Sequence, residues 1–270
     1  MAATQGVEDL GQDRAHTARV HNYLLGGSTH YRVDRAAGDA ALEAVPSTAL
    51  TARAGHTYAR HVARHLTDLG VRQFLDLGVG LPVQPYLHET VQAGASGTRT
   101  LYIDTDPIVL AYADALLTGS RTGRSECLEA DVRDPGALLT AVQQHDCIDL
   151  DRPVALFVHG LLDLLADDED PHGIVQTLLQ GLAPGSYLSL THHAADIAPG
   201  TAAALVSAYQ EHGIAFRPRT REQVEPFLAG LDLTGPGLTT ALRWRAGPHR
   251  APVWLTGQQA PVYAGTGRTR

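Results

Sequence analysis

The chain has 270 residues, of which 44% are hydrophobic and 19% are charged. This length and composition are typical of a globular protein with one domain of α/β size, and they exclude a disordered or fibrous chain. Its 21 basic residues, all arginine, are outnumbered by 29 acidic residues, which leaves a net charge of −8. A net acidic chain without a basic run is poorly suited to nucleic acids or anionic membrane surfaces. We therefore expect neither as a partner.

Two cysteines, Cys127 and Cys147, are too few for a disulfide framework or for a zinc site of thiolates, and we expect two reduced thiols. The N-terminus has no apolar core of the kind that a signal peptide needs. The longest apolar stretch, residues 153–166, is interrupted by His159 and Asp163 and is shorter than the roughly 20 residues that cross a bilayer. These features predict a cytoplasmic protein without a membrane-spanning segment.

Strand-like and helix-like segments alternate along the middle of the chain, after a helical region over residues 15–70. The expected strands cover 72–77, 100–104, 125–130, 153–158 and 186–191. The expected helices cover 83–93, 107–117, 173–182, 201–212 and 221–228. This alternation predicts a parallel sheet with helices on both faces, in which ligands bind beyond the carboxyl ends of the strands. The residues directly after each strand are therefore the first candidates for chemistry.

The first expected strand carries Asp76 near its end and leads into a glycine turn with Gly78 and Gly80. Glycines let the backbone turn sharply and let a ligand approach closely. Val83 stands where a dinucleotide-binding fingerprint would have its third glycine, so the turn does not suit a pyrophosphate. The acid before the turn suits a cationic or amino-bearing ligand instead.

Another acid ends the second expected strand, and a further one follows the third. Asp104 is placed to accept hydrogen bonds from ribose hydroxyls, and Asp131 is placed to meet an exocyclic amine of a base. The alternative interpretation is that Asp104, Asp106 and Asp131 cap helices, as acids in strand-to-helix connections often do. We expect Asp106, which precedes Pro107, to be a cap and Asp104 to bind a ligand.

Eight segments identify a family when they are taken together. They are ARVHNYLLGG (18–27), QFLDLGVGLP (73–82), YIDTDPIVLAYADALL (102–117), ADVRDP (130–135), DRPVALF (151–157), LAPGSYLSLTH (182–192), PGL with RWR (236–245) and VYAGTGR (262–268). They resemble the actinobacterial S-adenosylmethionine methyltransferase family once catalogued as domain of unknown function 574. The similarity covers most of the chain, from about residue 19 to residue 245, and the last segment resembles the family's last strand.

This resemblance implies a class I methyltransferase fold, which is an α/β fold with a Rossmann-like sheet of seven strands, mostly parallel, whose last strand is antiparallel. It implies S-adenosylmethionine as the cofactor. It places Asp76, Gly78 and Gly80 beside the methionine part, Asp104 and Thr105 at the ribose, and Asp131 and Val132 at the adenine. It also implies a helical lid over residues 1–70, in which Tyr23 and Gly27 contact the cofactor, and a cofactor-binding core over residues 71–270.

Three polar residues are candidates for catalysis. His159 follows the fourth strand, where the substrate of a class I enzyme comes close to the sulfonium methyl group. If a helix follows, Asp163 at i+4 would orient the imidazole as a general base; the alternative is a structural polar pair. His192 matches a histidine of the family, and we expect it, rather than His193, to face the pocket, since neighbouring strand residues point opposite ways. Nothing in the spacing of these residues demands a metal.

The sequence departs from the family where the substrate should bind. Asn22 replaces the usual aspartate, residues 28–31 read STHY instead of a charged segment, and His159 begins an unusual run. We therefore expect a methyltransferase with a small-molecule substrate of its own, in specialised metabolism. Two other functions stay open: an enzyme that uses the same fold and cofactor for a cyclisation or an intramolecular displacement, and a non-catalytic regulator that binds S-adenosylmethionine. The sequence does not indicate the oligomeric state.

Overall fold

The computed structural model describes residues 11–81, 83–116, 123–245 and 256–270. At its centre is one sheet with the strand order β3-β2-β1-β4-β5-β8-β6. Its consecutive parallel strands are β1 (Gln73–Leu77), β2 (Arg99–Asp104), β3 (Arg124–Glu129), β4 (Ala155–His159) and β5 (Tyr187–His193). The strand order reverses between β1 and β4, which is the place where open α/β sheets bind their ligands.

The antiparallel last strand is present as predicted. β8 (Val262–Arg268) runs antiparallel to β5, and both β6 (Asp232–Leu233) and β7 (Thr239–Thr240) pair with β8. β6 and β7 follow one another along the same edge of β8, so they fill one strand position that is interrupted by a turn. The sheet therefore has seven strand positions, six in one direction and one antiparallel, which confirms the sequence-based expectation.

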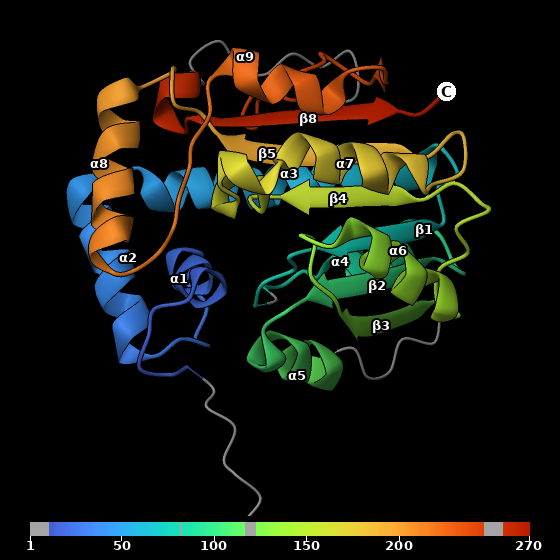
Figure 1. Ribbon diagram of the computed structural model, residues 1–270, viewed down its shortest axis with the longest axis horizontal. Helices are drawn as coiled ribbons and strands as arrows, with labels where there is room; N and C mark the ends of the chain where they lie inside the picture. Colours follow the sequence, from blue (N-terminus) through green and yellow to red (C-terminus); the bar gives the residue numbers. More distant parts are fainter. Residues whose placement is uncertain (1–10, 82, 117–122, 246–255) are drawn as a thin grey trace, which may run out of the picture.

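Helices cover both faces of the sheet (Figure 1). On one face, α3 (Thr48–Asp68) and α4 (Leu87–Gly94) pack on Phe74 and Phe157. On the other face, α6 (Pro135–Gln144) and α7 (Pro171–Gln180) pack on Leu75 and Leu156, the sequence neighbours of those two aromatic residues. α5 (Pro107–Leu116) lies beside β2 and β3. Because both faces of the sheet are buried, the central strands are apolar almost throughout.

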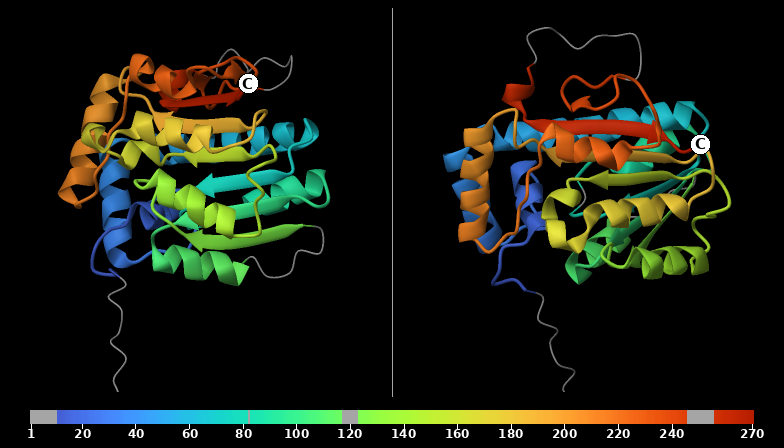
Figure 2. Two further views of the ribbon diagram at one scale, coloured as in Figure 1. Left: turned by 45° about the vertical axis from the view of Figure 1, so that its right-hand side comes forward. Right: turned by 45° about the horizontal axis from the view of Figure 1, so that its top comes forward.

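Three helices close the carboxyl edge of the sheet. α1 (Thr17–Leu24) packs on α2 (Arg32–Ala44), and α2 packs on α8 (Pro199–Glu211). Figures 1 and 2 show these helices together at the end of the molecule toward which β4 points. The N-terminal segment and a helix from the last third of the chain thus form one wall beyond the strand ends.

Three helical segments differ from the expectation. α6 was not predicted; it begins at Pro135, and Asp134 caps it by accepting a hydrogen bond from the Ala137 amide. The helix expected over 83–93 begins only at Leu87. The helix expected over 221–228 is α-helical as α9 (Arg221–Val224) and continues as a 3-10 turn through Pro226, which has no N–H for the helical ladder. In the described part of the chain, every helix is too short or too polar to cross a membrane.

Candidate active site

A cavity of about 530 Å³ lies at the carboxyl edge of the sheet, beside the point where the strand order reverses. The residues at the carboxyl ends of the strands make one end of the cavity acidic and place histidines at the other end. The acidic end carries Asp131 after β3, Asp104 at the end of β2 and Asp76 on β1. The histidine end carries His159 at the end of β4 and His193 at the end of β5. α1 and α3 form walls above both.

The turn after β1 is built by two glycines with a left-handed backbone. Gly78 has a φ of 64° and Gly80 a φ of 61°, a region that residues with a Cβ rarely adopt. A Cβ on Gly78 would lie 2.7 Å from a methyl carbon of Leu161, which follows β4, and a Cβ on Gly80 would lie 3.6 Å from the Cβ of Ala18 on α1. The turn therefore fits between α1 and the connection after β4, and both glycines line the cavity.

Asp104 fixes this turn from the neighbouring strand. Its carboxylate accepts hydrogen bonds from the backbone N–H groups of Gly80 at 3.1 Å, Thr105 at 2.8 Å and Asp106 at 3.0 Å. The Asp106 carboxylate accepts from the Ile108 N–H at 2.8 Å and so caps α5, which confirms the expectation for that residue. Asp104 and Thr105 both line the cavity, whereas Asp106 does not.

Asp76 lines the acidic end without a cationic partner among the described residues. Burial, together with the nearby charge of Asp104, raises the pKa of Asp76 to about 7. A carboxylic acid held in this way would regain its charge beside a bound cation, because opposite charge favours the ionised form. The acidic end is therefore suited to a ligand that brings an ammonium group to Asp76.

Asp131 and Val132 line the cavity after β3, the outermost strand of this half of the sheet. The Asp131 carboxylate accepts from the Arg133 N–H at 2.9 Å, and Val132 contributes an apolar surface that is 6% exposed. The structure thus brings seven of the predicted cofactor residues to one cavity: Asp76, Gly78, Gly80, Asp104, Thr105, Asp131 and Val132. Their contacts with the cofactor stay a prediction.

The other two predicted cofactor residues, Tyr23 and Gly27, do not line the cavity. The Tyr23 hydroxyl donates to Asp39 on α2, and its ring lies where a Cβ on Gly38 would come within 2.4 Å. Gly27 packs against the side chain of Asn22. The predicted face of α1 therefore contacts α2, and the opposite face, which carries His21, lines the cavity.

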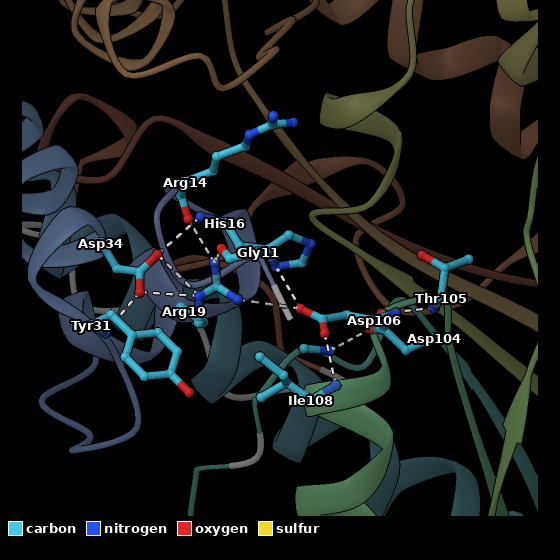
Figure 3. Close-up of polar contacts among 11 residues, drawn as sticks. Gly11, Arg14, His16, Arg19, Tyr31, Asp34, Asp104, Thr105, Asp106 and Ile108 are labelled. Atoms are coloured by element: carbon cyan, nitrogen blue, oxygen red, sulfur yellow. Dashed lines mark hydrogen bonds and ion pairs between the residues drawn. The ribbon is translucent and has the colours of Figure 1, made fainter. Parts of the chain in front are cut away.

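A network of ion pairs holds α1 close to the acidic end (Figure 3). The Arg19 Nε donates to both oxygens of the fully buried Asp34 carboxylate, at 3.1 and 3.0 Å. Toward the connection between β2 and α5, the carboxylate of Asp106 lies 3.3 Å from the His16 Nδ1 and 3.8 Å from an Arg19 Nη. We call these four residues the latch. It ties α1 to the connection that directly follows Asp104.

The helix on which the expected pairing of His159 with Asp163 depends does not form. The chain turns at Gly160, with a φ of 66°, and continues as a 3-10 turn over Leu162–Leu164. His159 contacts Ser189 instead, with 2.9 Å between Nε2 and Oγ. Burial and, as a smaller effect, His56 lower the pKa of His159 to about 3, so its imidazole is neutral at physiological pH.

Asp163 instead holds the two histidines at the end of β5. Its carboxylate lies 2.7 Å from the Nδ1 of His192 and 3.3 Å from the Nδ1 of His193, and it accepts from the His193 backbone N–H at 2.8 Å. Burial opposes the ionised form, but the combined attraction and hydrogen bonds of the two imidazoles lower the pKa of Asp163 below its ordinary range. The site thus contains an ionised carboxylate that is 1% exposed.

His193, and not His192, faces the cavity. Thr191 and His193 line it, and His192, between them on β5, points to the opposite face. His192 is fully buried and accepts a hydrogen bond at Nε2 from Arg219, at 3.0 Å. The expectation that His192 is the pocket residue is therefore corrected: the alternation along the strand holds, but the tertiary structure sets which set of alternating residues meets the cavity.

Sequence reasoning missed three further cavity residues, His21, His56 and Arg60. Burial, with smaller effects of His193 and His56, lowers the pKa of His21 to about 4. His56 and Arg60 lie one helical turn apart on α3, and His56 hydrogen-bonds to the backbone of Val83. Their i, i+4 spacing places them on one face of the helix, but nothing in the sequence says that this face meets a cavity.

The family model described as S-adenosyl methyltransferase matches residues 3–270. A structure of a DUF574 family protein from Streptomyces avermitilis is 34% identical, with a TM-score of 0.91 over 97% of this chain and 100% of that chain. A candidate methyltransferase from Thermobifida fusca is 31% identical, with a TM-score of 0.87 over 99% of this chain and 100% of that chain.

More distant matches add no functional detail. The plantazolicin methyltransferase BamL, in complex with a substrate analogue, is 12% identical with a TM-score of 0.53 over 97% of each chain, and this similarity concerns the fold alone. No protein of curated function matches the chain. The strand order and the first two structures confirm the predicted class I methyltransferase fold.

Proposed function

The chain belongs to the S-adenosyl methyltransferase family, and we propose that it transfers a methyl group to a hydroxyl oxygen of a small molecule. Its cofactor is S-adenosylmethionine. The observation that carries the proposal is one cavity that combines two features: an acidic end, whose Asp76 has no cationic partner among the described residues, and a histidine held by a buried carboxylate. Bound S-adenosylmethionine supplies an electrophilic methyl group. The protein must position the acceptor in line with it and take up the acceptor's proton.

The acidic end fits this cofactor in shape and in charge. Gly78 and Gly80 keep the turn after β1 free of side chains, and Asp76 would regain its charge beside the ammonium of the methionine part. Asp104, held by three backbone N–H groups, presents a fixed carboxylate for ribose hydroxyls. Residues 131 and 132 would then border the adenine. The latch supports the proposal that the helices of the N-terminal region form a lid over this end.

His193 is the proposed proton acceptor. Asp163 engages its Nδ1, which leaves Nε2 for the acceptor hydroxyl. The ionised carboxylate favours the imidazolium that forms when the proton arrives. His192 contacts the same carboxylate from the buried side and is itself held by Arg219, so we assign it as a positioning residue for Asp163.

His159 is proposed as an orienting contact of the acceptor. An imidazole whose pKa is lowered to about 3 is a poor proton acceptor near neutral pH. Its ring is fixed by Ser189, whose hydroxyl lies 3.0 Å from that of Tyr58. His159 can therefore offer one polar contact in a fixed place without changing its charge.

The histidine end favours an oxygen nucleophile over an amine. Among the described residues that line this end, the negative charge comes from the carboxylate of Asp163, which is already paired with two histidines. A protonated amine would find no counter-charge there. The cavity volume of about 530 Å³ is within the usual range for small-molecule sites, and α1 forms part of its wall.

The test is a methyl-transfer assay with labelled S-adenosylmethionine and panels of phenols, carboxylic acids and amines. We expect a labelled phenol, with one S-adenosylhomocysteine formed per product. His193→Ala should lower kcat by about 10²–10⁴, while His159→Ala, a matched loss of a cavity imidazole, should lower it less. Both variants should bind S-adenosylhomocysteine within a few-fold of the wild type.

Three results would contradict the proposal. A product formed without release of S-adenosylhomocysteine would indicate a cyclisation or an intramolecular displacement. Cofactor binding without turnover of any acceptor class would indicate a regulator. A His193→Ala enzyme with wild-type kcat, in the presence of saturating cofactor, would remove His193 as the base and return the search to His159.

A further inference from the structure

We infer that Arg60 is the carboxylate-binding residue of the cavity and that its ligand is the carboxylate on the methionine part of S-adenosylmethionine. The inference rests on the proposed function, since it takes the acidic end of the cavity as the cofactor site. Arg60 stands on α3 and lines the cavity. It lies outside every sequence motif that indicates the cofactor.

The guanidinium of Arg60 has no partner within the described part of the protein. Its Nε–H is buried and finds no hydrogen-bond acceptor, and no described carboxylate forms an ion pair with Arg60. Two other arginines near the cavity are neutralised: Arg19 by Asp34, and Arg133 by Glu169. Arg60 is half-buried, and its Nε–H has lost contact with water without gaining a partner. Because such a loss is costly for a charged group, an unpaired guanidinium in a cavity wall indicates an anionic ligand.

The position of Arg60 favours the cofactor over the acceptor. His56, one helical turn earlier on α3, hydrogen-bonds to the backbone of Val83, which follows the glycine turn. From there α3 continues along α4, against which it packs. Arg60 is thus on the side of the connection between β1 and α4, and His193 stands two strand positions from β1, across β4.

Arg60 and Asp76 form a pair of opposite charges that do not neutralise each other. They belong to α3 and β1, no ion pair joins them, and the groups that act on Asp76 are its buried surroundings and Asp104. A ligand with an ammonium and a carboxylate on the same carbon would satisfy both. An α-amino acid end has this arrangement, and S-adenosylmethionine carries one. Arginine also binds a carboxylate through two parallel hydrogen bonds, which fixes its orientation.

The experiment compares ligands with and without the amino acid end. Calorimetry on the full chain would measure the binding of S-adenosylhomocysteine and of 5′-methylthioadenosine, which keeps the adenosine and the sulfur but lacks the amino acid part. Arg60→Met should weaken S-adenosylhomocysteine binding by about 10- to 100-fold, as expected for charge-assisted hydrogen bonds. The affinity for 5′-methylthioadenosine should not change. Arg64→Met, at an exposed position of the same helix, should affect neither ligand.

Retained binding of 5′-methylthioadenosine shows that Arg60→Met is folded. If the variant does not fold, the inference can still be tested on the wild type with a ligand that lacks the carboxylate. Decarboxylated S-adenosylmethionine should bind the wild type about 10- to 100-fold more weakly than S-adenosylmethionine. Equal weakening of both adenosine ligands by Arg60→Met, or no weakening of either, would overturn the inference. So would equal wild-type affinity with and without the carboxylate. These are binding results, so a failure of methyl transfer would refute the proposed function and leave this subsite standing.

Discussion

Replacing Asp76 by asparagine should remove a pH dependence from cofactor binding. The pKa of Asp76 is raised from 3.8 to about 7 by burial and by Asp104. With that pKa, about one tenth of the molecules carry an ionised Asp76 at pH 6 and about three-quarters at pH 7.5. If the ammonium of the cofactor needs the ionised form, the apparent Kd is divided by that fraction. Wild-type affinity for S-adenosylhomocysteine should therefore rise about eightfold between these two pH values.

The raised pKa of Asp76 makes cofactor affinity increase with pH, but it makes the stability of the ligand-free protein decrease with pH. The folded chain keeps a proton on Asp76 that the unfolded chain has lost, between about pH 4 and pH 7, so the free energy of unfolding falls as the pH rises through this window. Asp76→Asn cannot ionise and escapes this loss. We expect the variant to have a higher Tm than the wild type at pH 7.5 and a similar Tm near pH 4.

The assay is calorimetry with S-adenosylhomocysteine at pH 6 and pH 7.5, together with thermal unfolding of the empty proteins. Asp76→Asn should bind weakly and equally at both pH values. Asp131→Asn is the control, because its carboxylate is 46% exposed and paired with Arg133; it should weaken binding without flattening the pH dependence. A wild-type affinity that is equal at both pH values, or an Asp76→Asn variant that binds like the wild type at pH 7.5, would refute this account of the acidic end.

Three further predictions concern the turn, the lid and the buried carboxylate. Gly80→Val should abolish binding of S-adenosylhomocysteine. The control is Gly97→Val, at an exposed turn with a φ of 74° and open space around it. Both variants should lose about 1–2 kcal/mol of stability, but Gly97→Val should leave the Kd unchanged. Limited proteolysis between residues 26 and 31 should slow when S-adenosylhomocysteine is added, and Arg19→Met, which breaks the latch, should accelerate cleavage; equal rates in all samples would argue against a lid. Asp163→Asn should lower the free energy of unfolding by about 3–5 kcal/mol in urea titrations at neutral pH. Because the folded pKa of Asp163 is lowered, its contribution should be complete above about pH 4 and should be lost as the pH falls below that value, so a wild type as stable at pH 2 as at pH 7 would contradict the pairing.

Most of the fold follows from local signals in the sequence. The apolar run at residues 153–158 indicates a strand buried on both faces, and the pairing of β4 with β1 and β5 confirms it. Asp106 before Pro107 indicates a cap, and its carboxylate caps α5. α6 was missed: its buried residues are only Leu138 and Val142, which give a weak period over ten residues.

The acidic end of the site could also be predicted, for a geometric reason. Parallel strands end at the same edge of a sheet, so acids at or just beyond the ends of neighbouring strands lie along one edge whatever the connections do. Asp76, Asp104 and Asp131 needed no knowledge of the rest of the chain beyond the strand pattern. Each of these acids can be recognised from the strand beside it in the sequence, and the same pattern of an acid at a strand end occurs three times.

The histidine end was decided by the tertiary structure. Gly160 turns the chain after β4, which carries Asp163 away from His159 and toward His192 and His193, some 30 positions along the chain. The face of α1 that lines the cavity, and the place of Arg60 on α3, likewise depend on how helices from the first quarter of the chain dock on strand ends far away. Such contacts join segments that share no periodicity and no fixed spacing, so the sequence names the residues but does not say which of them meet.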